Sequence, residues 1–70
     1  MLANYIVTGM TCQHCVNHVT EEVSALAGVD RVEVSLADGR MTVDSAQPID
    51  FDLIVAAVAE AGDDYTVAPA

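Results

Sequence analysis

The 70-residue chain carries eleven acidic residues against two arginines and no lysine, which gives a formal net charge of −9. Nucleic acid is therefore not an expected partner, because contacts to phosphate need a basic face; the charge serves either solubility or attraction to a basic patch on a protein. The length allows one domain over residues 1–70 without room for a deep substrate cavity, while an apolar fraction of 53% and a mean hydropathy of +0.39 predict a packed core.

The first part of the chain predicts a strand followed by a helix. Residues 3–8 alternate as a half-buried strand does, with Tyr5 and Val7 on one face. Over residues 13–27 apolar side chains recur at intervals of three and four, which is the pattern of a helix, and Gly28 is a natural stop. The apolar positions are Val16, Val19, Val23 and Leu26.

A hairpin is predicted next. Residues 31–36 and 40–44 alternate between apolar and polar side chains, and Asp38-Gly39 between them is a strong turn signal. Each segment therefore predicts a strand with one buried face.

A second helix is predicted between Asp50, which is suited to cap it, and Gly62, which ends it. Ile49 before the cap can pack on Ile54 inside the helix. Residues 65–68 then predict the last strand. The buried stripe of this helix is expected to be Leu53, Ile54, Ala57, Val58 and Ala61.

The elements follow one another in the order βαββαβ. The economical packing of two short helices and four short strands places both helices on one face of a four-stranded antiparallel sheet. We therefore predict an α+β fold of the ferredoxin-like type.

Membrane insertion and export are not expected. The longest apolar run, 53–59, has seven residues, which is too few to cross a bilayer. No basic residue precedes Arg31, so the beginning of the chain lacks the features of a signal peptide. The expected location is the cytoplasm.

The two cysteines of the chain, Cys12 and Cys15, stand in the stretch GMTCQHC. Cys12 falls in a loop and Cys15 in the first turn of a predicted helix, where unpaired N–H groups and the helix dipole favour the thiolate. A structural disulfide is not expected in a reducing cytosol. The placement suits metal binding and redox chemistry alike.

Counting ligands separates these chemistries. Structural zinc needs four, and Cys12, Cys15, His14 and His18 could supply them only from one loop and one helical turn, which would strain the site. Thioredoxin-type chemistry agrees with the cysteine spacing but not with so short a chain that has no Trp. Two thiolates alone suit a soft ion of low coordination number, above all Cu(I), and leave room for an incoming third thiolate.

The motif Gly9-Met10-Thr11-Cys12-x-x-Cys15, between a predicted strand and a predicted helix of a βαββαβ chain, resembles that of the heavy-metal-associated domain family. The resemblance covers the whole chain and points to the cytosolic copper chaperones of bacteria. It implies that Cys12 and Cys15 bind Cu(I) and that Met10 supports the loop from inside without being a ligand. The implied partners are the metal-binding domain of a copper-transporting P-type ATPase and a copper-responsive repressor.

The resemblance leaves alternatives to this function. Family members that favour zinc often carry an acidic residue where Thr11 stands, and mercury-binding members normally carry an export signal, so both differences favour copper. A Zn(II) or Hg(II) carrier, an excised metal-binding domain of a P-type ATPase and a small dithiol oxidoreductase are the rival hypotheses. Met1 directly before the first strand and Ala70 just after the last favour a complete small protein. The expected role is that of a metal carrier and not of an enzyme.

The end of the second helix departs from the family pattern. Bacterial copper members commonly have an aromatic residue directly after the terminal glycine, in a loop beside the metal, whereas Asp63 and Asp64 here separate Gly62 from Tyr65. Either Tyr65 fills that place beside the metal, or it joins the core and Asp63 takes the place. In the second case the carboxylate would raise the pKa of the cysteines.

The two histidines are expected to be exposed. His14 is a candidate auxiliary ligand where two molecules share copper. The metal-free chain is expected to be a monomer, and the copper-loaded chain is either a monomer or a metal-bridged dimer. His18 lies one turn further along the polar face of the helix. An auxiliary Zn(II) site formed by Cys15, His14 and His18 is a further hypothesis.

Overall fold

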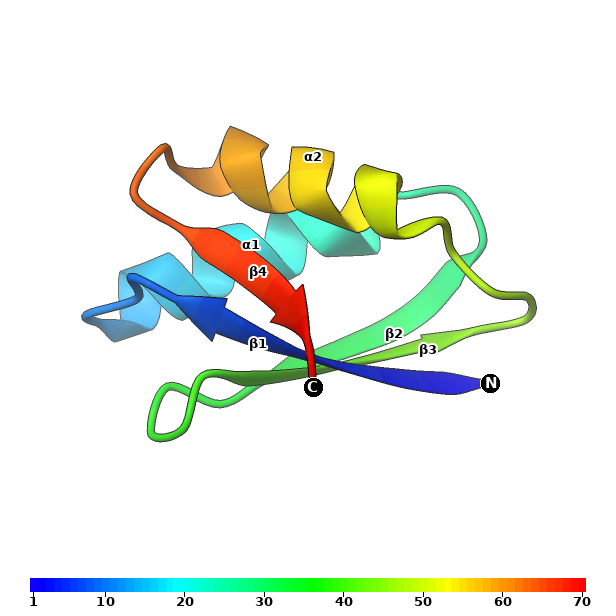
Figure 1. Ribbon diagram of the computed structural model, residues 1–70, viewed down its shortest axis with the longest axis horizontal. Helices are drawn as coiled ribbons and strands as arrows, with labels where there is room; N and C mark the ends of the chain where they lie inside the picture. Colours follow the sequence, from blue (N-terminus) through cyan, green and yellow to red (C-terminus); the bar gives the residue numbers. More distant parts are fainter.

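The computed structural model describes all of residues 1–70 and confirms the predicted order of elements (Figure 1). Three strands and a helix make up the first two thirds of the chain, and a helix and a strand complete it. In order, the elements are β1 (Leu2–Thr8), α1 (Gln13–Ser24), β2 (Val29–Val34), β3 (Arg40–Ser45), α2 (Phe51–Ala61) and β4 (Thr66–Pro69).

The four strands form one antiparallel sheet in the order β2-β3-β1-β4. Both helices lie against the same face of this sheet (Figure 1), which confirms the ferredoxin-like arrangement. Neither helix is long and apolar enough to cross a membrane.

The core lies between the sheet and the two helices. Alternate residues of the central strands point into it, namely Tyr5 and Val7 from β1 and Met41 and Val43 from β3. The ring of Tyr5 also stacks on that of Phe51, with ring centres 6.0 Å apart. The helices contribute Val16, Val19, Val23, Ile54, Ala57 and Val58.

The end of α1 and the hairpin differ from the predicted bounds. The helix ends at Ser24 rather than at residue 27, although Leu26 still packs, half-buried, against the core. β2 ends at Val34 rather than at residue 36, because the backbone turns at residues 35–39, where the Gly39 N–H donates to the Ser35 carbonyl at 3.0 Å. Leu36 therefore lies in the hairpin loop, 40% exposed.

The cap of α2 is confirmed, because the Asp50 side chain accepts a hydrogen bond from the Asp52 N–H at 3.2 Å. The predicted burial of Leu53 is wrong, since its side chain is 49% exposed. Each helical residue is rotated by about 100° from the last, so a stripe centred on Ile54 and Ala57 leaves Leu53 at its border on the outer side. α2 thus buries a narrower stripe than its composition indicates.

Candidate metal centre

Cys12 and Cys15 lie together at the beginning of α1. Cys12 is the N-cap residue with an extended backbone, and its carbonyl accepts hydrogen bonds from the Cys15 and Val16 N–H groups at 3.1 and 3.3 Å. This turn brings the two Sγ atoms within 3.4 Å of each other. That distance is less than twice a metal–thiolate bond of about 2.3 Å, so one ion can bridge both sulfurs.

The two sulfurs differ in their access to solvent. Both cysteines are free thiols; Cys12 is exposed, whereas Cys15 is half-buried in the first turn. A thiolate of another molecule can therefore approach the pair from the side of Cys12.

Tyr65 makes Cys15 an acidic thiol. A hydrogen bond from the Tyr65 hydroxyl, together with those from the Thr11 backbone and the Cys12 side chain, lowers the pKa of Cys15 to about 6. The same bond raises the pKa of Tyr65 to about 12, because the phenol must keep its proton to donate to the sulfur. At neutral pH Cys15 therefore favours the thiolate form that binds metal.

The position of Tyr65 answers the question left by the sequence. A Cβ atom on Gly62 would lie 2.8 Å from the Tyr65 ring, and one on Gly9 would lie 3.2 Å from it. The ring thus fits between the glycine that ends α2 and the glycine of the cysteine loop. Tyr65 occupies the place beside Cys15 while also packing, half-buried, against the core. Asp63 is exposed and is not among the groups that shift the pKa of Cys15.

This arrangement of Tyr65 could not be predicted from its own position. The available signal was the pair of glycines, because Gly9 and Gly62 are the residues whose missing side chains leave room for the ring. Gly9 also has a φ of +99°, and a Cβ there would lie 2.4 Å from the Asp64 carbonyl oxygen. The two loops are thus in direct backbone contact.

The other predicted site residues lie around this pair. Met10 is half-buried and packs against the core, while His14 and His18 are exposed. The structure has no group of three or more His, Cys, Asp or Glu side chains arranged to hold a metal ion, so it does not bring Cys15, His14 and His18 together as a zinc site. His18 instead lines a shallow hollow between the helices with Glu22 and Glu60.

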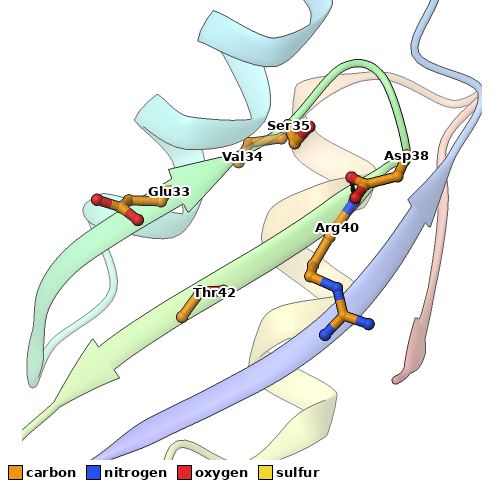
Figure 2. Close-up of a pocket in the computed structure, with 6 residues that line it drawn as sticks. All are labelled: Glu33, Val34, Ser35, Asp38, Arg40 and Thr42. Atoms are coloured by element: carbon orange, nitrogen blue, oxygen red, sulfur yellow. Dashed lines mark hydrogen bonds between the residues drawn. The ribbon is translucent and has the colours of Figure 1, made fainter.

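The hollow on the opposite face of the sheet contains none of these ligands. Figure 2 shows its lining, where the Arg40 side chain extends over the sheet and the Asp38 carboxylate accepts a hydrogen bond from the Arg40 backbone N–H at 3.0 Å. Without sulfur or imidazole, it has no candidate site for a soft metal ion. The lining residues are Glu33, Val34, Ser35, Asp38, Arg40 and Thr42.

Comparison with known families agrees with the fold. The heavy-metal-associated domain matches residues 4–64, which is most of the chain. The chain therefore belongs to the heavy-metal-associated domain family, and the predicted resemblance is confirmed.

Several characterised proteins share this similarity. The COP-associated protein of Helicobacter felis is 38% identical over 56 residues, which are 80% of this chain and 85% of that protein. The copper chaperone CopZ of Bacillus subtilis is 49% identical over 37 residues, 53% of this chain and 54% of CopZ. The mercuric reductase of Shewanella putrefaciens is 34% identical over 56 residues, so 80% of this chain matches 10% of the reductase.

Among solved structures, the yeast copper transporter domain Ccc2a, determined in apo and Cu(I)-loaded states, superposes with a TM-score of 0.85 at 25% identity. The match covers 99% of this chain and 93% of that domain. The relatives of this chain thus include a copper chaperone and a copper transporter domain.

Proposed function

We propose that this chain is a copper chaperone that binds one Cu(I) ion between Cys12 and Cys15 and passes it to a partner by thiolate exchange. The observation that carries the proposal is the pair of free sulfurs, 3.4 Å apart and open to solvent on one side. The proposed role is that of a carrier rather than an enzyme. A reducing compartment such as the cytoplasm is its natural setting, because the dithiol must stay reduced.

Exchange follows from the low coordination number of the site. An incoming thiolate bonds to the ion as a third ligand, after which the bond to one cysteine of this chain breaks and a second partner thiolate displaces the other. Each step forms one metal–sulfur bond and breaks one, without a change in the charge of the ion. The acidity of Cys15 supports both the capture and the release of the ion. A thiolate loses no proton when it binds the ion, and at neutral pH it takes up none when it releases the ion.

The chemistry of the ligands favours Cu(I) over zinc. Two thiolates without a third protein ligand suit a soft monovalent ion, whereas Zn(II) takes four ligands in structural sites. The uncharged Thr11 before Cys12, which departs from zinc-favouring members of the family, also supports copper. Hg(II), another soft ion, is the rival cargo, and similarity to part of a mercuric reductase supports including it in the test.

We further propose that the partners are the metal-binding domain of a copper-transporting ATPase and a copper-responsive repressor. Similarity to the copper chaperone CopZ and to a yeast copper transporter domain supports the first. The metal-free chain is proposed to be a monomer. The exposed His14 is the candidate extra ligand in a metal-bridged dimer.

Competition between metals tests the proposal. Cu(I) is titrated anaerobically into the reduced protein against a chelator of known affinity, then repeated with Zn(II) and Hg(II). The expected result is one tightly held Cu(I) that is lost in Cys12→Ser/Cys15→Ser and kept in the surface control His18→Asn. Full copper affinity in the double serine variant, or preferential retention of Zn(II) or Hg(II), contradicts the assignment.

A dithiol oxidoreductase is the second candidate, because a Cys15 pKa of about 6 next to a second thiol is also suited to disulfide exchange. Metal-free protein is assayed for turnover with a disulfide substrate and a thiol reductant. Turnover that Cys15→Ser abolishes would favour this candidate. If no turnover is detected, the oxidoreductase candidate is excluded and the copper carrier remains.

A further inference from the structure

The outward face of α2 is apolar in its middle. Leu53 and Val55 are 49% and 41% exposed, and Ala56 and Ala59 are exposed as well. With about 100° between successive residues, Ala56 and Ala59 point away from the core and the two larger side chains flank them. We call these four residues the α2 outer patch. Single exposed apolar residues are ordinary, whereas a contiguous group on one helix face is typical of a binding surface.

Carboxylates surround the patch. Asp52 lies on the same face before it, and Glu60 lies after it at the edge toward the hollow between the helices; both are exposed. Over residues 48–65 the chain has five acidic residues and no basic one. The two arginines are in β2 and β3 on the face of the sheet away from the helices, where Figure 2 shows Arg40. The patch therefore combines apolar contact area with an unneutralised negative border.

This combination defines the occupant. A second copy of the chain would bring its own Asp52 and Glu60 against these carboxylates, and an anionic membrane would also repel the carboxylates. We propose that the α2 outer patch docks a protein partner whose contact surface has apolar side chains bordered by lysine or arginine. Apolar burial supplies the affinity, and the charges set orientation and rate of encounter.

The proposed docking does not depend on copper. Leu53 lies nine residues before Gly62, the residue against which Tyr65 packs, and this separation is about 13 Å along a helix. A partner can therefore contact Leu53 and Val55, the two large side chains of the patch, without reaching the sulfurs, while only Ala59 lies near Gly62. Docking is expected to be the same in metal-free protein and in Cys12→Ser/Cys15→Ser, so its failure and the failure of the copper proposal are separate results.

The probe is a synthetic amphipathic helical peptide with a stripe of leucines bordered on both sides by lysines. Two comparison peptides replace its lysines by glutamate or its leucines by serine. The isotope-labelled, metal-free full chain is titrated with each peptide and followed by NMR. We expect shift changes centred on the α2 outer patch with the leucine–lysine peptide alone. Leu53→Ser/Val55→Ser is expected to weaken its Kd by about tenfold or more.

Leu36→Ser is the matched control, since Leu36 is 40% exposed in the hairpin loop, and it should leave Kd unchanged. Ala59→Glu, which places a carboxylate inside the patch, should weaken binding as the double serine variant does. Binding of the serine peptide with equal affinity would show that charge alone suffices and overturn the proposal. So would wild-type affinity in the double serine variant, a concentration-dependent dimer lost in that variant, or binding to anionic vesicles.

Discussion

At the scale of single residues, the acidity of the candidate site depends on a side chain fifty residues further along the chain. The Tyr65 hydroxyl is the largest cause of the lowered pKa of Cys15, and the Tyr65 ring is itself held between Gly9 and Gly62. The cysteine spacing predicted that Cys12 and Cys15 would form the site but carried no information about the effect of Tyr65 on Cys15. That effect arises from a contact between loops, which only the folded structure provides.

Replacing Tyr65→Phe should raise the pKa of Cys15 from about 6 toward its ordinary value of 9.0, because the largest cause of the shift is lost. The ultraviolet absorbance of the thiolate, followed against pH in metal-free protein, measures this. Tyr5→Phe, at the buried tyrosine of β1, is the control and should leave the titration in place. An unchanged Cys15 pKa in Tyr65→Phe would contradict the assigned hydrogen bond.

Because folding lowers the pKa of Cys15, the stability of the fold depends on pH. The folded-state pKa of Cys15 lies below its unfolded value, so its contribution to stability is fully present above pH 9 and is lost as the pH falls through about 6. Cys15→Ser should lack this part of the pH dependence.

Gly9→Ala should destabilise the fold more than Gly28→Ala. Both glycines have positive φ, +99° and +89°, so each alanine meets a strained backbone at about 1–2 kcal/mol. At Gly9 the new Cβ would also lie 2.4 Å from the Asp64 carbonyl oxygen, whereas at Gly28 the nearest atom is 3.5 Å away. Urea unfolding should show a further cost of about 1 kcal/mol or more for Gly9→Ala. Equal costs would mean that the two loops are not in contact.

At the scale of elements, α2 shows what a sequence pattern can and cannot determine. Its position, its Asp50 cap and its end before Gly62 were predictable because capping and helix ends depend on local chemistry. The predicted buried stripe included one residue too many, Leu53. Only Asp52 and Glu60 in this helix are polar, so the pattern of apolar residues does not mark where the buried face ends. In the hairpin, likewise, the alternation ran on to Leu36 although the backbone had already turned.

The two neighbours Leu53 and Ile54 should therefore respond differently to truncation. Ile54 is fully buried, so Ile54→Ala should lower the free energy of unfolding by about 2–5 kcal/mol. Leu53→Ala should change it by about 0.5 kcal/mol or less, as is usual at the surface. Urea unfolding of the two variants measures the contrast. A comparable loss of unfolding free energy in both variants would mean that Leu53 is buried in the core after all.

At the scale of the whole molecule, the net charge of −9 is confined to a body only 30 Å along its longest axis. At about 0.01 M salt the screening length is about 30 Å, so the carboxylates repel one another across the entire protein. This repulsion opposes the compact state and favours attraction of cationic partners.

Raising the salt concentration from about 0.01 M to about 0.1 M, which shortens the screening length to about 10 Å, should increase the Tm. Glu60→Gln/Asp63→Asn removes two charges and should show a smaller increase than the wild type, as measured by thermal unfolding followed by circular dichroism. A Tm independent of salt in both proteins would mean that repulsion does not limit stability.

The contact between Tyr65 and Cys15 has a consequence for the newly synthesised chain. Cys15 is made fifty residues before Tyr65, and β4, which follows Tyr65, pairs with β1, which precedes the cysteine loop. Until both are in place, Cys15 lacks the largest cause of its lowered pKa. The part of the Cys15 acidity that Tyr65 supplies therefore arises only once residues 65–69 have been made and have folded onto β1, and a chain that ends before Tyr65 lacks it.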